Sequence, residues 1–167
     1  MSALHVHHPM KNSKKLMASG RSVSGELAAR RQERNTKRRG ELAELAFAHK
    51  ASAMGFKVSK PYGDSERYDF VVDSGTRLWR VQVKCTTSRL CGMYRINSHR
   101  RTAEGVVPYD PRDVDFLACY VLPEDVWFVI PIEAACQSTS VLLCPKKWRK
   151  DNGKFEGYRE GWGLMLG

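Results

Sequence analysis

The chain has 167 residues, room for one domain, and its 42% of hydrophobic residues is enough to form a core. Its 28 Lys and Arg against 18 Asp and Glu give a net charge of +10, which points to a polyanionic partner, with nucleic acid ahead of a membrane surface. It contains neither a signal-peptide pattern nor an apolar run that could cross a bilayer, so we expect a cytoplasmic protein without a membrane partner. Five cysteines, an odd number without a CxxC pair, argue against a zinc site and fit a reducing compartment.

Most of the positive charge lies near the start of the chain. Residues 1–40 contain ten Lys and Arg against two acids, so they hold +8 of the net +10. Residues 1–23 are polar and lack hydrophobic periodicity, which predicts a disordered basic arm ahead of a single domain at residues 24–167. Beyond it, Lys37, Arg38 and Arg39 open a predicted helix, and we expect them to contact nucleic-acid phosphates. The alternative is a basic segment that serves only solubility.

Helical composition dominates the segment that follows the arm. It begins at residue 24, is interrupted by a predicted break at residues 35–36, and resumes as a second helix from Lys37 to about Met54. Gly55 then suits the left-handed conformation that commonly ends a helix.

Seven later segments have the composition of β-strands. Between them, the polar, Pro-containing stretch 99–112 is predicted to be a loop and residues 131–136 a short helix, while the tail at residues 155–166 is predicted to dock on the body. This order predicts a mixed α/β fold, with a mixed central β-sheet flanked by helices. The predicted strands are residues 56–58, 68–73, 78–85, 94–97, 114–121, 126–130 and 141–144.

The strand at residues 78–85 carries the first candidate site residues. Its strict alternation places Gln82 and Lys84 on one face, opposite an apolar face. On the preceding strand Asp69 stands beside an apolar run, where a carboxylate needs a partner, a metal ion or water. The turn that joins the strands brings Asp69 close to Gln82 and Lys84. The alternative is structural, with Lys84 an edge-strand lysine and Asp69 its ion-pair partner.

These residues and their order resemble the PD-(D/E)XK nuclease superfamily, in which an Asp on one strand precedes an acid-X-Lys triplet on the next and an upstream helix carries a Glu. The similarity is greatest to the group I intron-associated, homing-type endonucleases, whose triplet also carries Gln. The resemblance covers about residues 37–132. Its motifs are Gly40-Glu-Leu-Ala-Glu44, Gly55-Phe-Lys-Val, Pro61-Tyr-Gly-Asp64, Arg67-Tyr-Asp69, Arg80-Val-Gln-Val-Lys84, Val114-Asp-Phe and Trp127-Phe-Val-Ile-Pro131.

The resemblance implies a restriction-endonuclease-like core and a metal-dependent hydrolase that cuts phosphodiester bonds in DNA. Asp69 would be the central metal ligand, with Glu44 and the Val83 carbonyl completing a site for Mg²⁺, or for Mn²⁺ as a substitute. Gln82 would coordinate the metal or position water. Lys84 would hold or deprotonate the attacking water, or neutralise charge on the phosphate. Because cutting both strands of a duplex usually needs two active sites, we expect a homo-oligomer, a dimer or a tetramer.

Several assignments have rivals. Glu41 lies one turn before Glu44 on the same helix face, and Asp64, in a Gly-Asp turn, is a third candidate acid. Glu44 is preferred because related families place an acid eleven positions before the Gly of a Gly-aromatic pair, here Gly55. Since Gln82 replaces an acid, the alternative function is an inactive nucleic-acid-binding module on the same fold. A structural RNA-associated protein is a third hypothesis.

A second basic cluster surrounds Trp148. An aromatic side chain among cations is suited to contact a nucleic-acid backbone or base, although it equally fits anchoring of the carboxy-terminal segment. The nucleic-acid contacts predicted for this cluster are Lys146, Lys147 and Arg149.

Overall fold

The computed structural model describes residues 23–63, 65–103, 105–145 and 153–167, so the predicted disorder of residues 1–22 lies outside the described residues. The chain divides into two compact units, residues 1–35 and residues 36–167. The helix α1 (Val23–Ala53) is continuous through residues 35–36, and the predicted break there is wrong. Asn and Thr cost a helix interior only about 0.5 kcal/mol each, which the surrounding Arg, Lys, Glu and Leu offset by their own preference for helix.

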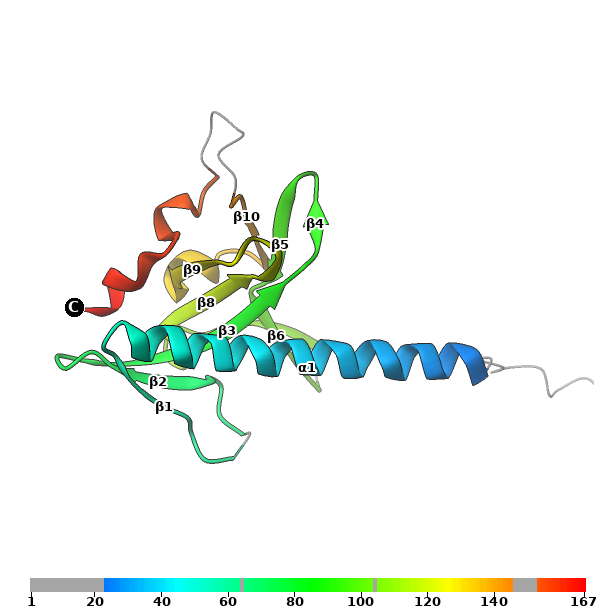
Figure 1. Ribbon diagram of the computed structural model, residues 1–167, viewed down its shortest axis with the longest axis horizontal. Helices are drawn as coiled ribbons and strands as arrows, with labels where there is room; N and C mark the ends of the chain where they lie inside the picture. Colours follow the sequence, from blue (N-terminus) through cyan, green and yellow to red (C-terminus); the bar gives the residue numbers. More distant parts are fainter. Residues whose placement is uncertain (1–22, 64, 104, 146–152) are drawn as a thin grey trace, which may run out of the picture. The chain divides into compact units, whose positions relative to one another are not determined.

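The second unit is built on a mixed five-stranded sheet (Figure 1). Strand β3 (Leu78–Thr86) pairs in parallel with β8 (Phe116–Val121) and antiparallel with β2 (Phe70–Asp73), and the other neighbours are antiparallel. The predicted α/β fold with a mixed central sheet is therefore confirmed. The strands in spatial order are β1 (Lys57–Ser59), β2 (Phe70–Asp73), β3 (Leu78–Thr86), β8 (Phe116–Val121) and β9 (Val126–Pro131).

One face of α1 packs against this sheet. Ala43, Phe47 and Ala51 follow one another at four-residue spacing, which places them on one side of the helix, and all three are buried. The Phe47 ring lies 5.3 Å from the ring of Phe70 and 5.6 Å from that of Trp162, centroid to centroid. This packing holds the second half of α1 beside the strands that carry the candidate site.

The remaining strands form smaller sheets. One consists of β10 (Ser140–Leu143), β5 (Met93–Asn97) and β4 (Arg89–Leu90), and a separate hairpin pairs β6 (His99–Thr102) with β7 (Gly105–Pro108). The predicted loop at residues 99–112 is therefore wrong at residues 99–102 and 105–108, which form strands. The hairpin has no buried face in either strand, so its sequence lacks the apolar alternation by which a strand is recognised.

Short helices complete the unit, and the carboxy-terminal tail is held against the sheet. The predicted short helix is α2 (Ile132–Ala135), and the 3₁₀ turns are η1 (Leu122–Glu124), η2 (Glu156–Tyr158) and η3 (Gly161–Met165). Trp162 is buried, and the Trp79 indole N–H donates to the Met165 carbonyl at 2.8 Å, so the predicted docking of the tail is confirmed.

An ion pair fastens the start of β8 to β3. One oxygen of Asp115 accepts hydrogen bonds from the backbone N–H of Arg80 at 2.7 Å and from its Nε at 3.1 Å, while the other accepts from its Nη2 at 2.9 Å. Burial raises the pKa of Asp115, but these bonds outweigh burial and leave that pKa below its usual range. The Asp115 carboxylate is thus a structural group.

We expect Asp115→Asn to lower the free energy of unfolding at pH 7 by about 1–3 kcal/mol, because Arg80 loses its charged partner. Since the folded pKa is depressed, the stabilisation from the charge is fully present above the unfolded pKa of about 3.9 and is lost as pH falls through the folded value. Urea unfolding of both proteins at pH 7 and at about pH 2.5 measures this. If the free energies of unfolding of the two proteins differed by the same amount at both pH values, the charge of Asp115 would not be the source of the stabilisation.

Candidate active site

The candidate site forms where β2 separates from β3. The last pair of their ladder is Phe70 with Val81, and beyond it β3 continues to Thr86 with β8 as its partner strand. The backbone N–H groups of β3 on the side of β2 therefore need other acceptors past this point. A carboxylate at Asp69, directly before β2, is placed to supply one.

Asp69 occupies this fork. Its backbone N–H donates to the Val81 carbonyl at 2.9 Å, which continues the ladder by one bond. Its Oδ2 accepts from the backbone N–H of Val83 at 2.7 Å and from the Gln82 side-chain amide at 2.5 Å. The predicted convergence of Asp69 and Gln82 is borne out by this contact, and Gln82 is almost fully buried.

The electrostatics of Asp69 are those of a carboxylate that would gain from a cation. Burial raises its pKa, and the neighbouring Glu44 carboxylate raises it further. The Val83 N–H, the Lys84 ammonium and the Gln82 amide oppose this rise without cancelling it. A partly buried carboxylate beside a second carboxylate is stabilised in its charged form when a cation lies between them.

Glu44 approaches the site from α1 and is held by a residue that the sequence interpretation missed. The Lys60 ammonium, just past β1, donates to Glu44 Oε2 at 2.7 Å, and this bond is the main cause of a raised Lys60 pKa. The Glu44 side chain is 26% exposed, whereas Glu41 is an exposed residue, so the geometry favours Glu44. Lys60 lies two residues after the half-buried Val58, so the alternation of side chains along a strand places the two on the same face. This alternation is the sequence signal that would have indicated Lys60.

Lys84 is the half-buried cation of the site. Its register partner on β8 is the buried Cys119, and its Nζ lies 5.6 Å from the ring centroid of Tyr109. Its charge lowers the pKa of Asp69, so it acts on the same carboxylate that Gln82 contacts. Within the described residues Lys84 has no ion pair, which argues against the purely structural alternative of a Lys84–Asp69 salt bridge.

The donors around Asp69 are few. In the described part of the chain, no three His, Cys, Asp or Glu side chains gather as a metal-binding cluster. The available oxygens are those of Glu44 and Asp69 and the carbonyl of Val83, with Gln82 beside them. Mg²⁺ takes one or two carboxylates and keeps several waters, so this donor set fits Mg²⁺.

The predicted nucleic-acid contacts fall into two groups. Lys37 and Arg38 are exposed on α1, and Arg39 is half-exposed, with its guanidinium donating to the Thr87 hydroxyl at 3.1 Å. The other candidates lie outside the described residues, as does the rival acid at position 64. They are Lys146, Lys147 and Arg149.

Comparison with known proteins agrees with this geometry. Residues 34–165 match a family model described as PD-(D/E)XK endonuclease. The chain belongs to this family. A solved bacterial homing endonuclease, I-Ssp6803I, is similar at 33% sequence identity and a TM-score of 0.70, over 78% of this chain and 93% of that one. The search of curated proteins found no match. The predicted family and fold are confirmed, and the endonuclease belongs to a group that generally uses divalent metal ions.

The contact between Gln82 and Asp69 in the endonuclease predicts a charge-dependent effect. We expect Gln82→Glu to lower the free energy of unfolding at pH 8 in EDTA by at least about 1 kcal/mol, because two carboxylates would then lie within hydrogen-bond distance. Near pH 5 the loss should shrink, since the pair can share a proton. Urea unfolding measures both values. The control Gln82→Met removes the hydrogen bond without adding charge, and a pH dependence as large in Gln82→Met would contradict this explanation.

Proposed function

We propose that the endonuclease hydrolyses phosphodiester bonds in DNA with a divalent ion, Mg²⁺ in the first place and Mn²⁺ as a substitute. The observation that carries this proposal is the fork, where Asp69 is buried enough for its pKa to rise and lies within the field of both Glu44 and Lys84. A pair of carboxylates next to a lysine on the adjacent strand provides both cation binding and charge neutralisation in one place.

Each residue has a distinct role in this proposal. Asp69 and Glu44, with the Val83 carbonyl, would hold the ion, which when bound supplies Lewis-acid activation of the phosphate and of water. Lys84 holds or deprotonates the attacking water and neutralises the charge that builds on the phosphate. Gln82 fixes the Asp69 carboxylate through the bond between its amide and Oδ2. A residue that holds a ligand in place in this way maintains metal geometry without adding charge.

Gln82 also keeps the second hypothesis open to test. An amide gives the site one negative charge fewer than the acid it replaces, so an inactive nucleic-acid-binding module on the same fold remains the alternative. The two hypotheses make opposite predictions about metal-dependent cleavage, while both predict binding to nucleic acid.

Cleavage of supercoiled plasmid in Mg²⁺ is the direct test. We expect nicked and linear products from the unaltered protein and a rate about 10²–10⁴-fold lower from Lys84→Ala, because the proton-transfer and charge-neutralising group is lost. Lys154→Ala, an exposed lysine that contacts Gln137, is the control and should cleave normally. Equal cleavage by Lys84→Ala would remove Lys84 from the mechanism. Absence of cleavage by every protein, with binding retained, would favour the inactive module.

Lys60 provides a second test that does not depend on turnover. Its ammonium competes with a metal ion for the negative charge of Glu44, so Lys60→Gln should bind Mg²⁺ more tightly, by about fivefold for an interaction of roughly 1 kcal/mol. Titration calorimetry with Mg²⁺ measures the affinity. The matched control is Lys57→Gln, three residues earlier in the chain and paired with Asp73, and it should leave the affinity unchanged. Weaker binding by Lys60→Gln would mean that Lys60 supports the metal site.

Three further predictions belong to this proposal. Residues 24–167 form one nuclease domain behind a basic arm at residues 1–23, and the protein assembles as a homodimer or tetramer so that both strands of a duplex are cut. The cytoplasm is the expected compartment. None of the described helices is long and apolar enough to span a membrane.

A further inference from the structure

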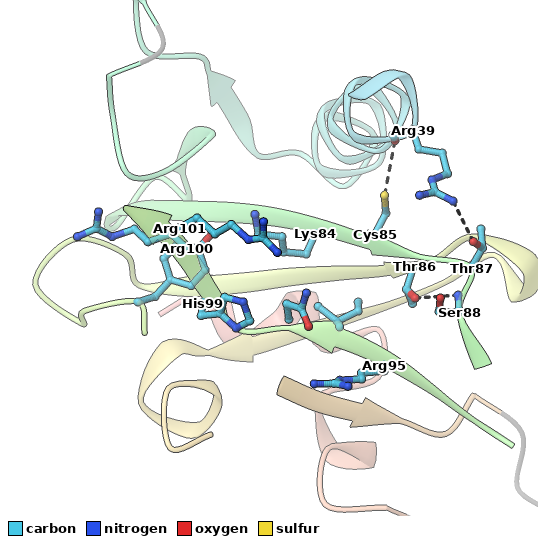
Figure 2. A pocket seen from close by; sticks show the side chains of 13 residues that line it. Arg39, Lys84, Cys85, Thr86, Thr87, Ser88, Arg95, His99, Arg100 and Arg101 are labelled. Carbon is cyan, nitrogen blue, oxygen red and sulfur yellow. Dashed lines mark hydrogen bonds between the residues drawn. The ribbon is translucent and has the colours of Figure 1, made fainter. Parts of the chain in front are cut away.

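Next to Lys84 the second unit contains a cavity of about 760 Å³ whose lining is strongly cationic (Figure 2). Five Lys and Arg side chains line it, and none of its thirteen lining residues is acidic. They come from α1, from β3 and the turn after it, from β5 and from the β6–β7 hairpin. The five cations are Lys84, Arg39, Arg95, Arg100 and Arg101.

Several other arginines of the second unit are held in ion pairs, whereas those of this cavity are not paired with any acid that the structure describes. Four arginines elsewhere are held in ion pairs, namely Arg67, Arg80, Arg112 and Arg159. By contrast, among the residues that the structure describes, no acid pairs with any of the four arginines of the cavity. Like charges gathered without counter-charges repel one another, so the cavity is stabilised by an anion that enters it.

The cavity continues the candidate active site. Lys84 belongs to both, and the lining then follows β3 through Thr86 to Thr87 and Ser88. In Figure 2, Arg100 and Arg101 lie near Lys84, while Arg39 lies beside Thr87. Hydroxyl groups and arginines in succession along a strand are the partners that successive backbone phosphates take.

The composition of the lining distinguishes a polyanion from a small ligand. Pockets for small molecules are mostly apolar with a few polar groups, whereas here the chief apolar contributions are Ile96 and Tyr109. A nucleotide-sized ligand would also leave several of the five cations without a partner. A phosphodiester chain supplies one negative charge at each step and can satisfy them together.

We propose that this cavity is the track for the DNA backbone that leads to Lys84, with Arg95 and Arg100 as phosphate contacts beside the predicted Arg39. The inference rests on the proposed function, since it places the scissile phosphate at Lys84. It assigns positioning of the duplex to the cavity, because phosphate contacts fix register without reading sequence.

The test measures binding without metal. The protein and the variants Arg95→Gln, Arg100→Gln and the double variant are titrated against a fluorescein-labelled 30-base-pair duplex (about three helical turns) in EDTA at several KCl concentrations. The slope of log affinity against log salt should become shallower by about 0.9 for each lost phosphate contact, equally for duplexes of different sequence. The matched control is Arg77→Gln, an exposed arginine that stacks on Trp79 away from the cavity, and its slope should be unchanged.

Other outcomes decide against the track. Slopes in Arg95→Gln and Arg100→Gln equal to that of Arg77→Gln would overturn it, once circular dichroism melting shows that the variants are folded. A larger slope change with duplex RNA than with DNA would assign the cavity to RNA. If a free nucleoside triphosphate protects the protein against thermal unfolding and this protection depends on Arg95, the cavity is assigned to a small ligand. If the protein does not cleave plasmid but the expected slope changes are found, only the proposed activity is refuted. If it cleaves plasmid but the slopes of the variants are unchanged, only the track is refuted.

Discussion

The candidate site depends on one structural event, the separation of β2 from β3 after the pair formed by Phe70 and Val81. The separation leaves the backbone N–H of Val83 without a strand partner, and Asp69 Oδ2 accepts it at 2.7 Å. Because the carboxylate is anchored by the backbone, its position follows from the sheet rather than from a side-chain rotamer alone. The same burial that anchors it raises its pKa, so the structural role and the demand for a cation have one origin.

Gln82 is best understood from this constraint. An acid at that position would place a second carboxylate against Asp69 whenever the cation is absent, and the fork would then be held by repelling groups. The amide instead donates to Asp69 at 2.5 Å and stabilises the fork without metal. The chain thus keeps a folded, preorganised site, but the site has one negative charge fewer with which to bind a cation. The Lys60 ammonium, paired with Glu44, lowers the affinity for a cation further.

Local periodicity explains which parts were predictable. The alternation of β3 identified Gln82 and Lys84, and the turn to β2 identified Asp69, because strand parity and hairpin pairing are short-range. The β6–β7 hairpin was missed because an exposed ribbon has no apolar period, and Lys60 because its partner Glu44 is sixteen residues away on another element. The helix through residues 35–36 was missed because good capping residues also remain acceptable inside a helix.

The distribution of charge was the hardest property to obtain from sequence. Residues 41–167 are nearly neutral in sum, so the sequence assigned most of the basic character to residues 1–40. A sum cannot distinguish paired from unpaired charges, however. In the folded unit Arg67, Arg80, Arg112 and Arg159 are neutralised locally by acids, so they contribute little at a distance. The cations around the cavity beside Lys84 keep their field, and they gather where the proposed reaction needs a polyanion to be held.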